Sequence, residues 1–102
     1  MMAWHKVAAL AELPEGEVIE VKVGDTSIAL YNVEGAVYAT GNICTHAFAC
    51  LHEGFLEGYK IECPLHQQLF DVRSGEALEG PAEEDLPVYP VKVEDGAILV
   101  EV

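Results

Sequence analysis

The sequence predicts an all-β protein built from short antiparallel strands. Several segments alternate apolar and polar residues with the two-residue period of a half-buried strand, and short turn signals separate these segments. No segment carries an apolar pattern typical of a helix of three turns or more. The 102 residues suffice for one domain with a modest core, and they contain no internal repeat or low-complexity segment.

The first part of the chain predicts an edge strand followed by a three-stranded meander. Residues 4–10 form the edge strand, and residues 17–23 alternate clearly. Residues 26–33 are more uniformly apolar, so we expect this strand to be covered on both faces. The tight turn Glu34-Gly35 then leads into the third strand of the meander, residues 36–39.

The second part of the chain predicts four more strands: residues 59–62, 69–72, 88–94 and 97–102. The dipeptide Asp95-Gly96 lies between the last two and is a strong signal for a two-residue hairpin. Residues 79–87 hold one glycine, two prolines and four acids, and they predict a loop.

Two loops between these strands each offer one thiolate and one imidazole. The first carries Cys44 and His46, and the second carries Cys63 and His66. Such a set could hold one zinc ion, or a [2Fe–2S] cluster in which two histidines replace two cysteines on one iron. The spacing favours the cluster, because zinc sites usually repeat short Cys-x₂₋₄-Cys or His-x₃₋₅-His pairs.

These loops, Cys44-Thr45-His46 and Cys63-Pro64-Leu65-His66, resemble the two halves of the Rieske motif. Three other segments resemble soluble Rieske ferredoxins, so the likeness covers most of the chain: Glu53–Gly58, Gly80-Pro81-Ala82 and Tyr89-Pro90-Val91. The resemblance implies an antiparallel Rieske-like fold, a β-sandwich or barrel of short strands. It also implies a single domain of residues 1–102, with a small cluster-binding subdomain inserted at about residues 41–72.

The resemblance further implies one Rieske-type [2Fe–2S] cluster, with Cys44 and Cys63 on one iron and His46 and His66 on the other. With neutral imidazoles the oxidised cluster carries no net charge, whereas an all-cysteine cluster is already negative. Histidine ligation therefore makes the addition of one electron easier and raises the potential. We expect His46 and His66 to lie at the protein surface, where the electron leaves.

The sequence resembles the low-potential branch of the family. High-potential Rieske proteins carry a serine and a tyrosine after the second histidine ligand, and here those positions are Gln68 and Phe70. Leu65 stands where those proteins have a cysteine that joins the two loops in a disulfide. The missing hydroxyls predict a low reduction potential for the class.

Cys50 and His52 form a second Cys-x-His pair that could be mistaken for ligands. The pair at Cys44 and His46 fits the family better, because Thr45 matches its usual middle residue. We expect Cys50 to be a small buried hydrophobic residue. We expect His52 to be a surface residue beside the cluster.

The net charge limits the kinds of partner, and the pattern of apolar residues limits the location of the protein. The 18 acidic and 5 basic residues give a net charge of −13, which argues against nucleic acid or anionic membranes and favours a partner with a basic surface. Glu53, Glu57 and Glu83 are candidates for steering such a partner. No apolar run reaches the ~20 residues of a membrane span, and no secretion signal is recognisable. We expect a soluble, monomeric cytoplasmic protein without a disulfide framework.

The resemblance implies an electron carrier rather than an enzyme, since the chain has no room for a separate catalytic domain. Ferredoxins of this type take electrons from a flavin-dependent reductase that oxidises NAD(P)H. They pass them to the Rieske centre of a terminal ring-hydroxylating dioxygenase in aromatic hydrocarbon catabolism. One alternative is a small Rieske subunit of an assimilatory nitrite reductase, and another is a structural zinc-binding module.

Overall fold

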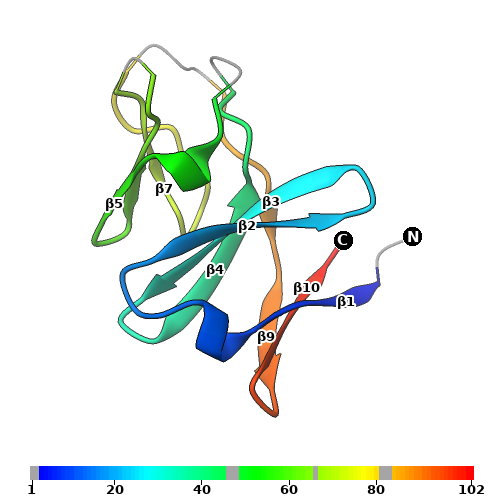
Figure 1. The fold of residues 1–102 in the computed structure, drawn as a ribbon. Helices are drawn as coiled ribbons and strands as arrows, with labels where there is room; N and C mark the ends of the chain where they lie inside the picture. Colours follow the sequence, from blue (N-terminus) through cyan, green and yellow to red (C-terminus); the bar gives the residue numbers. More distant parts are fainter. Residues whose placement is uncertain (1–2, 46–48, 66, 81–83) are drawn as a thin grey trace.

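The computed structural model describes residues 3–45, 49–65, 67–80 and 84–102, and it confirms the predicted all-β antiparallel architecture (Figure 1). Over these residues the strands are β1 (Trp4–Ala9), β2 (Val18–Val23), β3 (Thr26–Val33), β4 (Ala36–Gly41), β5 (Phe55–Glu57), β6 (Lys60–Glu62), β7 (Leu69–Asp71), β8 (Val88–Tyr89), β9 (Val91–Glu94) and β10 (Ala97–Glu101). Two short 3₁₀ turns, η1 (Leu10–Glu12) and η2 (Leu51–Glu53), interrupt them.

The strands form three antiparallel sheets, with orders β1-β10-β9, β2-β3-β4-β8 and β5-β6-β7. The small β5-β6-β7 sheet lies at one end of the molecule, and the β9–β10 turn lies at the opposite end (Figure 1). None of the helices in the described parts of the chain has the length and hydrophobicity needed to cross a bilayer.

Strand β3 is buried on both faces, as its apolar sequence predicted. Ile28 and Leu30 share one hydrophobic core with the β1-β10-β9 sheet. Ala29 and Tyr31, which alternate with them, share a second core with Phe70 of the small sheet. The central sheet therefore separates two cores, because successive side chains of a strand point to opposite faces.

The hairpin turns follow the local sequence signals. Glu34 and Gly35 both have positive φ, at 54° and 93°, and so do Asp95 and Gly96, at 51° and 76°. Positive φ at both central residues is the property of the type I′ turn, whose twist matches that of the flanking strands. The predicted hairpin at Asp95-Gly96 is confirmed.

The predicted strand over residues 88–94 is two strands that belong to different sheets. Tyr89 in β8 pairs with β4, and Val91 in β9 pairs with β10. Pro90 lies between them and lacks the N–H that a continuous ladder would need. Its carbonyl oxygen still accepts a hydrogen bond of 3.0 Å from the backbone N–H of Glu101. The chain therefore changes sheets at the proline.

Strand β5 was not predicted, because three residues are too few to display a period. Its position depends on a close backbone approach to β6. A Cβ added at Gly54 would overlap the carbonyl oxygen of Glu62, so only glycine fits there. Gly58, at a φ of 58°, then turns the chain from β5 into β6.

Candidate metal centre

Two thiols from separate hairpins meet inside the core. Cys44 follows β4 of the central sheet, and Cys63 follows β6 of the small sheet. Their exposed fractions are 4% and 1%, and both belong to the core that contains Phe70. The side chains of Cys44 and Cys63 lie within hydrogen-bonding reach of each other, and neither forms a disulfide.

The surroundings of Cys63 disfavour a free thiolate. The pKa of the Cys63 thiol is raised to about 11, chiefly by burial and also by the neighbouring Cys44 thiol. The backbone N–H of Leu65 acts in the opposite direction, since it donates to the Cys63 sulfur over 3.5 Å. Without a metal ion, Cys63 is therefore protonated at neutral pH.

This pair of residues fits a metal group. Thiolates are the protein ligands of zinc and iron–sulfur sites, and a metal ion takes the place of the thiol proton. Two adjacent thiols that share one dry site can bind the same metal ion. The Leu65 N–H then supplies a hydrogen bond to a coordinating sulfur, which is one of the contacts that tune such sites.

The two predicted histidine ligands, His46 and His66, lie outside the described residues, as does the predicted steering acid Glu83. Within the part of the chain that the structure describes, no three His, Cys, Asp or Glu side chains come together as a metal site. The predicted surface position of the two histidines stays a prediction.

The first loop is held to the central sheet by Asn42, whose side chain is fully buried. The Asn42 backbone N–H donates to the Ser27 carbonyl oxygen over 3.1 Å, and its carbonyl oxygen accepts from the Leu51 N–H over 2.7 Å. Its side-chain amide contacts the Ser27 hydroxyl at 3.1 Å, and its Oδ1 accepts from the His52 backbone N–H over 2.9 Å. Asn42 therefore joins both ends of the loop to β3.

Cys50 differs from the expectation for it, and His52 makes a contact that the sequence did not predict. The His52 ring is half-buried, and its Nδ1 lies 3.0 Å from the Asn42 side-chain nitrogen, so His52 supports the loop rather than simply facing solvent. Cys50 is also half-buried rather than buried. It lines a groove between the two loops, together with Glu53 and Leu65. The position of Cys50 reflects its short β-bridge to Ile43.

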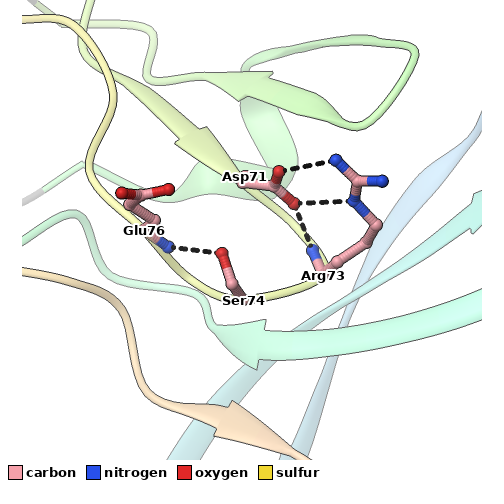
Figure 2. A network of polar contacts seen from close by, with 4 residues as sticks. All are labelled: Asp71, Arg73, Ser74 and Glu76. Atoms are coloured by element: carbon pink, nitrogen blue, oxygen red, sulfur yellow. Dashed lines mark hydrogen bonds and ion pairs between the residues drawn. The ribbon is translucent and has the colours of Figure 1, made fainter.

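An aromatic pair, Tyr59 and Tyr38, connects the small sheet to the central sheet, and Arg73 stacks on its Tyr59 ring. Arg73 donates to both carboxylate oxygens of Asp71, with Nε–Oδ1 at 3.1 Å and Nη2–Oδ2 at 2.9 Å (Figure 2). The guanidinium carbon lies 4.0 Å from the centre of the Tyr59 ring, which meets the Tyr38 ring edge-on. The hydrogen bonds from Arg73 hold the pKa of Asp71 below its usual range. Sequence reasoning missed this contact, because it depends on the β5–β6 turn reaching β4.

Comparisons with known proteins agree with the motif. A family model described as Rieske [2Fe-2S] domain matches residues 3–90. The chain is 51% identical to the ferredoxin component of naphthalene 1,2-dioxygenase/salicylate 5-hydroxylase systems from a Ralstonia species, over 96% of this chain and 94% of that protein. It also matches a chain in the solved complex of reduced oxygenase and oxidized ferredoxin in carbazole 1,9a-dioxygenase. That match has 39% identity and a TM-score of 0.90, over 95% of this chain and 91% of the other.

A more distant likeness connects the chain to another redox system. A solved Mycobacterium tuberculosis chain, described as an NADH-dependent nitrite reductase small subunit, has 26% identity and a TM-score of 0.88. The match covers 100% of this chain and 96% of that chain. The sequence is therefore more similar to the dioxygenase ferredoxin components than to this subunit.

The buried hydrogen bonds of Asn42 generate the first prediction. Replacing Asn42 with leucine leaves the His52 N–H without its side-chain acceptor, and an unsatisfied buried group costs ~1–3 kcal/mol. Chemical denaturation of Asn42→Leu should show a loss of this size in the free energy of unfolding. Ser27→Ala is the control, because it removes only one partner of the same side chain and should cost less. An Asn42→Leu protein as stable as wild type would contradict this role for Asn42.

Proposed function

The chain belongs to the Rieske [2Fe–2S] family, and on that basis we propose that it is the ferredoxin component of a ring-hydroxylating dioxygenase system, a carrier of single electrons. The observation that carries the proposal is a likeness to such components that extends over nearly the whole length of both proteins. The relatives are named as ferredoxin components, so the role is electron transfer rather than catalysis.

The chain binds one Rieske-type [2Fe–2S] cluster, which accepts and releases one electron at a time. Cys44 and Cys63 hold one iron in this proposal, and His46 and His66 hold the other. The adjacent burial of the two thiols supports the first half of that assignment. The whole chain, residues 1–102, acts as one Rieske domain whose cluster-binding subdomain covers about residues 41–72.

The partners follow from the same likeness. The ferredoxin partners a terminal oxygenase of a dioxygenase system. It takes its electrons from a flavin-dependent reductase that oxidises NAD(P)H, and it works as a monomer in the cytoplasm. The alternative role, a small subunit of a nitrite reductase, is supported less, because the likeness to such a subunit is more distant. A zinc module does not account for the family match.

The ligand assignment predicts which substitutions remove the cluster. Cys44→Ser and Cys63→Ser should abolish stable assembly, because each takes away one of two thiolates on the same iron. Cys50→Ala and His52→Ala are the matched controls from the second Cys-x-His pair, and both should keep the red-brown colour. Iron and acid-labile sulfide assays measure how much cluster each variant holds. A colourless Cys50→Ala or His52→Ala protein would show that the wrong pair had been assigned.

The missing hydroxyls predict a potential near the lower end of the roughly −150 to +300 mV range of Rieske centres. Phe70 is fully buried in the same core as the two thiols. A hydrogen bond to a charged group is worth ~1.5–3 kcal/mol, so the added hydroxyl in Phe70→Tyr should raise the potential by about 60–130 mV. Redox titration of both proteins tests this. A wild-type potential well above zero would remove the chain from the low-potential branch.

Charge steering predicts the salt dependence of electron transfer to the oxygenase. Glu53 is exposed beside Leu65, which is 47% exposed and lies two residues after Cys63. Stopped-flow rates of oxygenase reduction should fall as the ionic strength rises beyond ~0.15 M, because salt screens the attraction. Glu53→Lys should slow the reaction further and leave the cluster potential nearly unchanged.

Glu94→Lys is the control for this experiment. It makes the same change of charge next to the β9–β10 turn, at the opposite end of the molecule from the small sheet (Figure 1). It should slow the reaction less than Glu53→Lys does. Rates that do not change with salt would show that docking depends on apolar contacts instead. If the reduced protein passes no electrons to the terminal oxygenase of a dioxygenase system, the proposed function is contradicted.

A further inference from the structure

The small β5-β6-β7 sheet has one face on the core and one face toward solvent. Successive side chains of a strand point to opposite faces, and Leu56, Ile61 and Phe70 pack on the core that contains the two thiols. The residues that alternate with them line a hollow of about 200 Å³ on the other face, here called the outer face: Phe55, Glu57, Lys60, Glu62 and Leu69.

Phe55 is the most exposed part of the outer face, with an exposed fraction of 69%. It lies opposite Glu62 in the strand register, and Glu62 lies opposite Leu69, so Phe55 and Leu69 border the hollow from its two outer strands. A single exposed apolar side chain is common on protein surfaces and marks no contact by itself. The ring and the adjoining hollow together give a partner an aromatic anchor and a recess to fill, which is the composition of an interface core.

The outer face lies next to one of the proposed ligands. Glu62 is the residue before Cys63, and Phe55 lies one strand spacing of ~4.8 Å from Glu62. Electron-transfer complexes bury less than ~1,200 Å² in total, so each partner contributes a patch of about 600 Å², which is a disc about 14 Å in radius. A patch of this size around the ligand loops therefore extends onto the outer face.

The charge of the outer face fits a basic partner. Glu57 and Glu62 line the hollow, and Glu53 precedes β5. Lys60 also lines the hollow, is exposed, and forms no ion pair with any residue that the structure describes. The face is acidic on balance, in agreement with the net charge of −13.

From these observations we propose that the outer face is part of the surface that docks the terminal oxygenase, with Phe55 as its apolar anchor. The inference rests on the proposed function, and it adds one side of the molecule to the contact around the ligand loops. A similar ferredoxin has a solved complex with its oxygenase, which favours the oxygenase as the occupant. The matching surface is an apolar socket for Phe55, surrounded by Lys or Arg side chains.

The experiment measures docking separately from electron transfer. Reduced ferredoxin is mixed anaerobically with the oxidised oxygenase of a naphthalene 1,2-dioxygenase system, and oxygenase reduction is followed by stopped flow over a range of oxygenase concentrations. Phe55→Ala should raise the half-saturating concentration about fivefold or more, the factor equivalent to the ~1 kcal/mol that distinguishes an important interface residue. The limiting rate at saturation, the cluster content and the cluster potential should keep their wild-type values, because Phe55 lies outside the core.

Two further variants serve as references for Phe55→Ala. Phe55→Leu keeps an apolar side chain and should give a smaller shift of the half-saturating concentration. Val93→Ala is the matched control, because Val93 is 43% exposed and lies on β9, in a different sheet. It should leave the half-saturating concentration at the wild-type value.

Lys60→Gln tests the charge of the partner by an expected gain. It removes a base from the hollow, so it should lower the half-saturating concentration about twofold, an effect typical of a single exposed charge. The gain should disappear at high salt, which screens the interaction. Lys6→Gln removes an exposed base from β1, in another sheet, and should have less effect.

Several outcomes would overturn the inference while leaving the proposed function intact. These are a Phe55→Ala protein with the wild-type half-saturating concentration, an equal shift in Val93→Ala, and weaker docking of Lys60→Gln. Phe55→Ala might also disrupt a different occupant: slower reduction by the flavin-dependent reductase alone, or loss of a wild-type dimer in sedimentation, would assign the face to the reductase or to a second copy. If the wild type passes no electrons to the oxygenase, the proposed function and this inference are overturned together.

Discussion

The rest of the structure depends on the burial of two thiols, Cys44 and Cys63, side by side in one apolar core. Water is excluded from this position, which disfavours a bare thiolate and raises the pKa of Cys63. A metal ion compensates that cost because it takes the place of the proton. The folding of this end of the molecule is therefore linked to the assembly of the cluster.

The central sheet provides the platform for this arrangement. One face of β3 packs on the β1-β10-β9 sheet and forms a core without any proposed ligand. The other face packs on the core that contains the thiols. The first loop is anchored to this platform by Asn42, and the small sheet is connected to it by the edge-on contact of the Tyr59 ring with Tyr38 of β4. An electron carrier binds and leaves its partners repeatedly. Its cluster site therefore has to keep its geometry without help from a partner, and the central sheet provides that support.

Local signals in the sequence were enough to predict most of the strands and the ligand loops. The alternation in β2 and the dipeptide Asp95-Gly96 act over a few neighbouring residues, and the structure follows both. The two ligand loops, one Cys-x-His and one Cys-x₂-His, were recognisable because the chemistry of a cluster restricts the ligands to few residue types. Cys44 and Cys63 lie in one buried core in the structure, and their role as ligands stays a prediction, as does that of His46 and His66.

The remaining features depend on contacts between distant residues. The division of the predicted strand at Pro90 follows from which sheet edges are available, and short β5 exists because Gly54 can approach Glu62 closely. The hydrogen bond from Thr45 to Glu84 joins residues 39 positions apart in the sequence, and no local pattern predicts such a contact. The contact of His52 with Asn42 was missed for the same reason, since these residues lie ten positions apart and no local pattern pairs them.

The most direct test of the account is pulsed electron paramagnetic resonance on the reduced protein, with its histidines labelled with ¹⁵N. The account predicts a single [2Fe–2S] signal that is coupled to nitrogens from two histidines, and loss of one coupling when either His46 or His66 is replaced with cysteine. A cluster without nitrogen coupling, or a colourless protein that binds zinc, would contradict the account.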